Sequence, residues 1–361
     1  MARINNICFL FVLLLTATFA NAHDFEIGGV YYNIISETNN VEVCNGATLY
    51  SGDINIPLTV IYSEQTYNVT RIGENAFNNC IGLTSISIPE SVESIGKDAF
   101  KGCSNLSKAI FHSVKDLCEI EFGNSNSSPL YLSHHLYIGE NEITVLEVPA
   151  GVTEIKNYAF AGGKFITIFR LGPNVITIGN DVFKNCNGYQ VRYASFDQML
   201  GINYGDGDSN PMGNANNVTL ANSSLSNDIT ITQDIKKYAF KGAKWIKKVS
   251  ISSDVTNIGQ KAFCDCAELS SVTLPTSLTV IGEGAFYGCK KLTNITIPAP
   301  SYPDHFGKDV FRECTSLINA EITAPLTTLP EGLFYGCTNL TSVVLPKETQ
   351  VIGKNTFKGC I

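Results

Sequence analysis

Residues 80–103 read Cys80-Ile-Gly-Leu-Thr-Ser-Ile-Ser-Ile-Pro-Glu-Ser-Val-Glu-Ser-Ile-Gly-Lys-Asp-Ala-Phe-Lys-Gly-Cys103, one full copy of a pattern that recurs along the chain. Ten phenylalanines close an Ile-x-x-x-x-Phe unit, with Phe306 and Leu329 in place of the isoleucine in two copies: Phe77, Phe100, Phe160, Phe183, Phe240, Phe263, Phe286, Phe311, Phe334 and Phe357. Within blocks of copies the spacing is 23 residues, except for 25 between Phe286 and Phe311. A fixed period of this length is typical of a solenoid, whose coils bury their apolar side chains only against their neighbours. The sequence therefore predicts one stacked array rather than several globular domains.

The copy at 80–103 also predicts the path of one coil. Leu83, Ile86 and Ile88 alternate with polar residues, so we expect a strand whose apolar side chains point inward while Ser85 and Ser87 point outward. Pro89 is expected to end this strand because proline has no N–H to donate to a sheet. Glycine at position 96 is expected to permit a turn, and residues 98–102 to form a short helical or strand-like segment.

Eight of the twelve cysteines occupy one position of the repeat, three residues after the phenylalanine: Cys80, Cys103, Cys186, Cys266, Cys289, Cys314, Cys337 and Cys360. Gly163 and Ala243 stand at this position in two copies. In a stacked array these residues form a structural column on the core side, with neighbours about 4.8 Å apart. Free cysteine packs there as a small apolar side chain, whereas a disulfide would require neighbouring side chains to turn toward each other. The spacing favours buried free thiols over a disulfide framework.

Two irregular segments, near 112–150 and 194–230, interrupt the 23-residue rhythm and resemble each other. Six positions of the first align at a constant offset with six of the second: Leu117, Ile120, Phe122, Gly123, Asn124 and Pro129 with Met199, Ile202, Tyr204, Gly205, Asp206 and Pro211. We therefore expect a larger unit, made of two regular coils and one irregular segment that bulges from the array.

The N-terminal residues differ in character from the repeats. Residues 1–22 have a positive start at Arg3, an apolar stretch from Ile7 to Phe19 and small residues before His23, which predicts a secretory signal peptide cleaved after Ala22. Residues 23–71 alternate apolar and polar side chains in several short runs, which predicts a β-rich cap on the solenoid. The solenoid itself is expected to span 72–361. These features predict a secreted or cell-surface protein with no membrane insertion after the signal is removed.

Composition excludes some partners. The chain has 25 Lys and Arg against 33 Asp and Glu, a net charge of −8, and no basic tract. Nucleic acids and anionic membranes are therefore poor candidates.

The string Cys-x-x-Leu-x-x-Ile-x-Ile-Pro-x-x-Val-x-x-Ile-Gly-x-x-Ala-Phe-x-x-Cys at 80–103 resembles the leucine-rich repeat of BspA-like surface proteins, the TpLRR class. Copies at 266–289 and 337–360 match it nearly position for position. The stretch at 129–139 also resembles the irregular segment of that family. The resemblance implies a leucine-rich-repeat solenoid of right-handed β-strand and short-helix coils. It also implies a surface protein that binds host, matrix or cell-surface proteins.

The outward strand positions supply the candidate binding residues, which we expect on the concave face of the solenoid. They are Ser85, Ser87, Lys108, Arg170, Trp245, Lys248, Ser271, Thr273, Asn294, Thr296, Asn319, Glu321 and Ser342. Hydroxyls, amides and a few charges suit an adaptable binding surface. They equally suit strands that simply face solvent, and the sequence leaves both interpretations open. Trp245 either anchors a partner or packs on a neighbouring coil, and packing is favoured.

Two other motifs are weak as sites. His134 and His135 are adjacent, so on a strand they would point to opposite faces, and no third metal ligand is near them in sequence. Asp206-Gly-Asp208-Ser-Asn210 begins like a calcium loop, but Pro211 and Asn217 stand at the sixth and twelfth positions, so a turn is favoured. No catalytic pair is apparent, and we expect neither an enzyme nor a cofactor. The favoured hypothesis is a binding or adhesion protein that recognises protein partners; the alternative is a surface protein that binds glycans.

Overall fold

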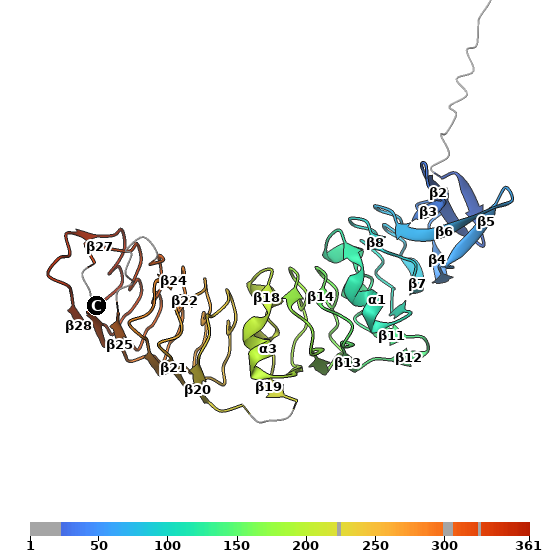
Figure 1. The fold of residues 1–361 in the computed structure, drawn as a ribbon. Coiled ribbons are helices and arrows are strands. Elements are labelled where there is room, and N and C mark those ends of the chain that lie inside the picture. The colour runs from blue at the N-terminus through green and yellow to red at the C-terminus, as the bar shows by residue number, and fades with distance from the viewer. Residues whose placement is uncertain (1–22, 222–224, 299–305, 324–325) are drawn as a thin grey trace, which may run out of the picture.

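The computed structural model describes residues 23–221, 225–298, 306–323 and 326–361; the predicted signal peptide at 1–22, including Cys8, lies outside the described residues. The chain forms a solenoid whose regular coils have a longer strand, a turn that carries the repeat phenylalanine and, in most coils, a two-residue strand between them. Figure 1 shows these coils stacked into an elongated, bent array, with the N-terminal β-rich segment at one end and the last coil at the other. The predicted solenoid is confirmed.

The longer strands form the long-strand face, on which parallel neighbours follow one another in four successive sheets. The sheets contain β4 (Ser51–Asn55), β7 (Gly82–Ile88), β9 (Lys108–Phe111), β11 (Leu136–Ile138) and β12 (Asn141–Glu142); β13 (Val145–Glu147), β15 (Ile168–Arg170), β17 (Gln190–Tyr193) and β19 (Asn217–Leu220); β20 (Asp228–Ile231), β21 (Lys248–Ile251) and β23 (Ser271–Thr273); and β25 (Asn294–Ile297), β26 (Asn319–Ile322) and β28 (Ser342–Val344). Only β12 is antiparallel to its neighbour. Alternate side chains of these strands point into the core, as the alternation in sequence predicts.

A second set of very short strands forms the short-strand face, which the sequence pattern does not predict. Its strands are β8 (Ser94–Ile95), β10 (Glu121–Phe122), β14 (Glu154–Ile155), β16 (Thr177–Ile178), β18 (Asn203–Tyr204), β22 (Asn257–Ile258), β24 (Val280–Ile281), β27 (Thr328–Leu329) and β29 (Val351–Ile352). The expected turn at Gly96 is present: the Ala99 backbone nitrogen donates to Gly96 O at 3.3 Å, at the start of the turn that carries Phe100. A Cβ at Gly96 would lie 2.4 Å from the backbone nitrogen of Glu74 in the preceding coil, so glycine is needed there for close stacking.

The segment at 98–102, expected to be helical or strand-like, is a double turn. Asp98 and Gly102, two residues before and two residues after Phe100, have positive φ angles of 55° and 80°. The same two positions have positive φ in all ten repeat copies. Glycine, asparagine and aspartate adopt this conformation most readily, which explains their frequency there.

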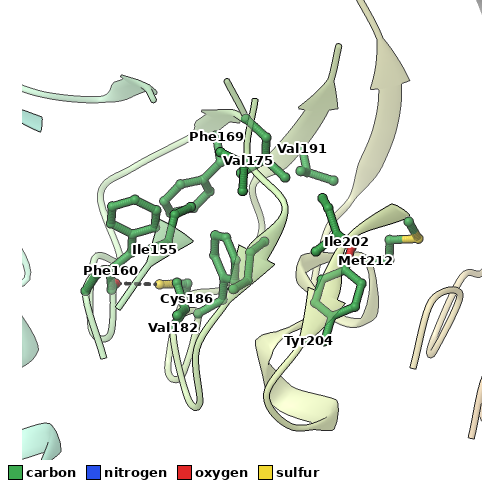
Figure 2. Packing of buried hydrophobic residues seen from close by; sticks show 14 of the residues in the cluster. Ile155, Phe160, Phe169, Val175, Val182, Cys186, Val191, Ile202, Tyr204 and Met212 are labelled. Carbon is green, nitrogen blue, oxygen red and sulfur yellow. Dashed lines mark hydrogen bonds between the residues drawn. The ribbon is translucent and has the colours of Figure 1, made fainter. Parts of the chain in front are cut away.

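The repeat phenylalanines and cysteines build the core between the two faces. From Phe240 to Phe357, consecutive rings lie stacked with centroids 5.1 to 5.9 Å apart. Seven of the eight column thiols donate to the carbonyl oxygen of the repeat phenylalanine in a preceding coil, at sulfur–oxygen distances of 3.0 to 3.3 Å. Figure 2 shows one of these bonds, from Cys186 to Phe160, among apolar side chains. Each of the eleven described cysteines is a free thiol, and burial raises the pKa of Cys186 to about 12.

Residues 112–150 and the described helical part of the second irregular segment, 194–220, do not bulge from the array as expected. Each is a coil of the stack in which a helix joins the longer strand to the short one: α1 (Val114–Glu119) between β9 and β10, and α3 (Phe196–Gly201) between β17 and β18. A third helix, α2 (Leu130–Ser133), and the 3-10 turns Ser125–Ser127, Gly207–Ser209 and Pro211–Gly213 complete these coils. None of the described helices is long and apolar enough to cross a membrane.

The N-terminal segment is joined to the first coils by strand pairing on both faces. It consists of β1 (Phe25–Ile27), β2 (Val30–Ile35), β3 (Asn40–Cys44), β5 (Thr59–Tyr62) and β6 (Gln65–Ile72), together with β4. Strand β4 pairs with β7 on the long-strand face, and β6 pairs with β8 on the short-strand face. The segment therefore covers the N-terminal end of the solenoid core.

Candidate binding face

The strand register brings the outward residues of the long-strand face into rows. Lys248 lies beside Ser271, and Ser250 lies beside Thr273. In the last sheet, Asn294, Asn319 and Ser342 form one row, and Thr296, Glu321 and Val344 form the next. Most of these side chains are exposed because the strand's alternation turns them away from the core. These predicted residues are thus neighbours in space as well as in the repeat.

The face is hollowed across β23, β25, β26 and β28, where a groove of about 780 Å³ follows the two rows. Asn319 Nδ2 donates to Asn294 Oδ1 at 2.8 Å, so the two amides form a short ladder on the groove floor. Thr296 Oγ1 donates to Glu321 Oε2 at 3.4 Å. Glu321 is the single charged residue among the described residues that line this groove. The groove therefore offers hydroxyls, amides and one carboxylate to a partner.

At the N-terminal end of the face, the chain itself covers one predicted residue. Ser85 is only 8% exposed, and its hydroxyl donates to Asp53 Oδ1 of β4 at 2.6 Å. This bond, with a second one from Thr84, lowers the pKa of Asp53. Ser87 is half-buried, and the Lys108 ammonium lies 5.4 Å from the ring centroid of Tyr137 on β11. The outward position of Ser85 is thus not open to a partner, because β4 adds a strand that the repeat pattern did not reveal.

In the middle of the face, the structure adds residues that the sequence analysis missed. Arg170 on β15 lies between Glu147 on β13 and Arg192 on β17. Its Nη1 contacts Glu147 Oε2 at 3.1 Å. Strand β13 follows the repeat spacing as Ile143-x-x-Leu146-x-Val148, and the run Gln190-Val-Arg-Tyr193 alternates polar and apolar residues, so the sequence could have identified both strands.

Trp245 is not an exposed anchor. It lies in the turn before β21, partly buried against the core, and its Nε1 is buried without a hydrogen-bond partner among the described residues. Its neighbour in the predicted set, Lys248, is exposed and its ammonium lies 3.7 Å from Asp228 Oδ2. Packing, the favoured interpretation for Trp245, agrees with this placement.

The shape of the face also differs from the expectation. In Figure 1 the strands from β13 to β28 lie along the outer side of the bend, and the short strands from β14 to β27 lie along its inner side. The predicted concavity of the long-strand face is therefore not seen along this part of the array. The face is hollowed locally instead, at the groove over β23–β28 and at a smaller hollow of about 430 Å³ beside Arg170 and Arg192.

The histidine and aspartate motifs have local contacts. His134 Nδ1 lies 2.9 Å from Gly162 O, and His135 pairs with Glu142 and stacks on Phe165. Asp206 Oδ1 accepts from the backbone nitrogens of Asp208 and Ser209, so it caps a 3-10 turn. Across the described ranges, no group of three or more His, Cys, Asp or Glu side chains is placed to hold a metal ion.

Strands, stacked phenylalanines and a parallel long-strand face define the class as a leucine-rich-repeat solenoid. The family model described as "BspA type Leucine rich repeat region" matches six copies over residues 58–190 and 233–361. The chain belongs to this family of BspA-type leucine-rich-repeat proteins. None of the curated proteins compared with the chain matches it.

Three of the solved structures that resemble this chain are of bacterial proteins. A leucine-rich cell surface protein from Faecalibacterium prausnitzii is 19% identical, with a TM-score of 0.52, and the match covers 89% of this chain and 94% of that one. The pneumococcal vaccine antigen PcpA is also 19% identical, with a TM-score of 0.51 and coverage of 91% and 86%. A leucine-rich repeat protein from Bacteroides ovatus is 24% identical over 94% and 93% of the two chains, with a TM-score of 0.49. At 19% identity, the likeness to the first two structures shows the fold alone.

Proposed function

We propose that this chain is an exported surface protein that binds protein partners through its long-strand face. One observation carries the proposal: exposed hydroxyl and amide side chains from successive strands are held in rows around a groove of about 780 Å³. Rigid strands position these groups without covering them, and extended solenoid surfaces of this kind commonly serve binding. The predicted signal peptide would place this face outside the cell.

The groove favours a protein partner over a glycan. Sugar rings are commonly held against exposed aromatic side chains, which present a flat apolar face. The described lining of the groove contains no aromatic ring; it consists of hydroxyls, amides, small apolar residues and Glu321. A polypeptide offers backbone and side-chain groups that match this lining, and a basic residue would pair with Glu321.

The proposal is tested by immobilising residues 23–361 and measuring the binding of matrix and host-cell surface proteins. We expect Asn319→Arg, which places a long charged side chain in the groove, to weaken binding at least tenfold. The matched control is Asn203→Arg, at an exposed asparagine of β18 on the short-strand face, and it should bind as the parent does. Equal binding by both variants, or no protein retained by the parent array, would contradict the proposal.

A further inference from the structure

We infer that Arg170 and Arg192 form a recognition site for a carboxylate-bearing segment of a protein partner. The inference rests on the proposed function and adds a second contact region to the same face. The two arginines are direct register partners on the parallel strands β15 and β17. Both side chains are half-buried and lie at the hollow of about 430 Å³.

The arginines have donors left over after their contacts within the chain. Arg170 Nη1 donates to Glu147 Oε2 at 3.1 Å and its Nε is buried, whereas its Nη2 has no hydrogen-bond partner among the described residues. Arg192 Nη2 donates to the carbonyl oxygen of Ala221, and none of the described carboxylates lies within 4.0 Å of its side-chain nitrogens. A guanidinium has five N–H donors in a planar fork that fits a carboxylate in a bidentate manner. Two guanidinium groups beside one carboxylate therefore leave room for a second carboxylate.

The hollow is preorganised by the helix of the second irregular segment. Gln198 on α3 accepts a hydrogen bond from the Ala194 backbone nitrogen and donates to Gly172 O, so it joins the chain after β17 to the chain after β15. Gly172 packs closely on the preceding coil, since a Cβ there would lie 2.6 Å from Val148 O. The ends of the two strands that carry the arginines are therefore held at a fixed distance from each other.

The equivalent place in the first large unit shows that the fold does not require these arginines. Strand β9 corresponds to β17 at an offset of 82 residues, so Ile110 stands where Arg192 stands. In the preceding coil, Ser87 on β7 takes the place of Arg170 and pairs directly with Ile110. The same backbone therefore forms with Ser and Ile at these positions. The arginine pair is found in the second unit and is not needed for the fold.

The walls of the hollow favour a peptide as the source of the carboxylate. Pro149, Leu171 and Pro173 line it beside the arginines. Tyr193, the aromatic residue of the described lining, is fully buried, so its ring is not available for stacking on a sugar. An acidic residue flanked by apolar residues matches both the charge and the walls. A sulfated glycan would match the charge alone.

The experiment compares acetyl-(Leu-Glu)3-amide with acetyl-(Leu-Gln)3-amide on ¹⁵N-arginine-labelled chain 23–361. We expect the glutamate peptide, and not the glutamine peptide, to shift the Nε–H signals of Arg170 and Arg192, with binding that weakens as salt is added. Arg192→Gln should weaken this binding at least tenfold, whereas Arg71→Gln, an exposed arginine on β6, should leave it unchanged. Arg192→Lys keeps the charge but not the planar fork, and it should also weaken binding if it is folded.

Three outcomes would overturn the inference: equal shifts with both peptides, unchanged affinity in folded Arg192→Gln and Arg192→Lys, or shifts only with a heparin tetrasaccharide. The proposed function is tested separately by Asn319→Arg in the distant groove. If the parent chain binds its protein partner but does not respond to the glutamate peptide, the arginine site alone is refuted.

Discussion

The two irregular segments share a backbone but differ in chemistry. Ser113 and Ser195 cap α1 and α3 in the same way, each accepting from a backbone nitrogen three residues later at 3.1 Å. Buried Leu117 and Met199 then anchor the helices to the core. Other positions differ: Ile110 corresponds to Arg192, and the buried Phe111 to Tyr193. Helix caps and a few apolar anchors thus suffice to build this coil, and the other positions are open to new functions.

The largest effect on stability is expected from the two buried helix residues, and it tests whether α1 and α3 are attached to the core equally strongly. Leu117→Ala and Met199→Ala each remove a side chain that is 0% exposed, so each should lower the free energy of unfolding by about 2–5 kcal/mol. Urea denaturation followed by circular dichroism measures this, with hydrogen exchange to show whether the loss is local. Lys115→Ala, on the exposed side of α1, is the control and should change stability by no more than about 0.5 kcal/mol. If Leu117→Ala or Met199→Ala lost less stability than Lys115→Ala, the helix that carries the substituted residue would not be part of the core.

A smaller effect tests the buried tyrosine pair of the second segment. Tyr193 and Tyr204 place their hydroxyls 3.3 Å apart in the core, where the first segment has Phe111 and Phe122. Tyr193→Phe leaves the Tyr204 hydroxyl buried without its partner and should cost about 1–3 kcal/mol. The double variant Tyr193→Phe/Tyr204→Phe reproduces the first segment and should recover most of this loss. A double variant no more stable than Tyr193→Phe would mean that the hydroxyl bond is not the reason for the pair.

Two alanine substitutions isolate the contribution of the thiol–carbonyl bond in the cysteine column. Cys186 donates to Phe160 O at 3.1 Å, whereas Cys118 on α1 is equally buried outside the column. Substitution of either by alanine removes the same atom, so the cavity and transfer costs are similar. Cys186→Ala should therefore lose about 0.5–1.5 kcal/mol more than Cys118→Ala, the usual net value of one hydrogen bond. Equal losses in thermal or urea unfolding would show that the bond adds nothing to packing.

The sequence predicts the solenoid because one period positions the core residues of the regular coils, and a repeated Phe or Cys can be recognised without knowing its partners. It does not reveal the short strands, because two residues such as Ser94 and Ile95 are too few to show an alternation. It also misses contacts made by strands outside the pattern. Asp53 covers Ser85, and Arg192 joins Arg170, through register partners that only the stacked backbone brings together. The rows of outward residues can be predicted from the period. The exposure of these residues and the charge of the surface around them also depend on strands outside the repeat pattern, such as β4 and β17.

The smallest effect concerns pH and the pair His134 and Asn216, which correspond in the two segments. Burial lowers the pKa of His134 below its ordinary value of 6.5, and the nearby charge of Lys164 acts in the same direction. The folded state therefore binds fewer protons at this site than the unfolded state does. The stability that the neutral imidazole contributes is complete above pH 6.5 and is lost as the pH falls through the folded-state pKa.

His134→Asn installs the residue of the second segment, which does not titrate. The difference in unfolding midpoint between the parent and His134→Asn should therefore shift against the parent as the pH is lowered from 7.5 to 5. His112, whose pKa is raised by its bond to Asp116, remains in both proteins, so its opposite contribution cancels in the difference. A difference in midpoint that is constant over this range would contradict the lowered pKa of His134. An imidazole with the same pKa in the folded and unfolded states makes no pH-dependent contribution to stability, so His134 and Asn216 would then be equivalent in this respect.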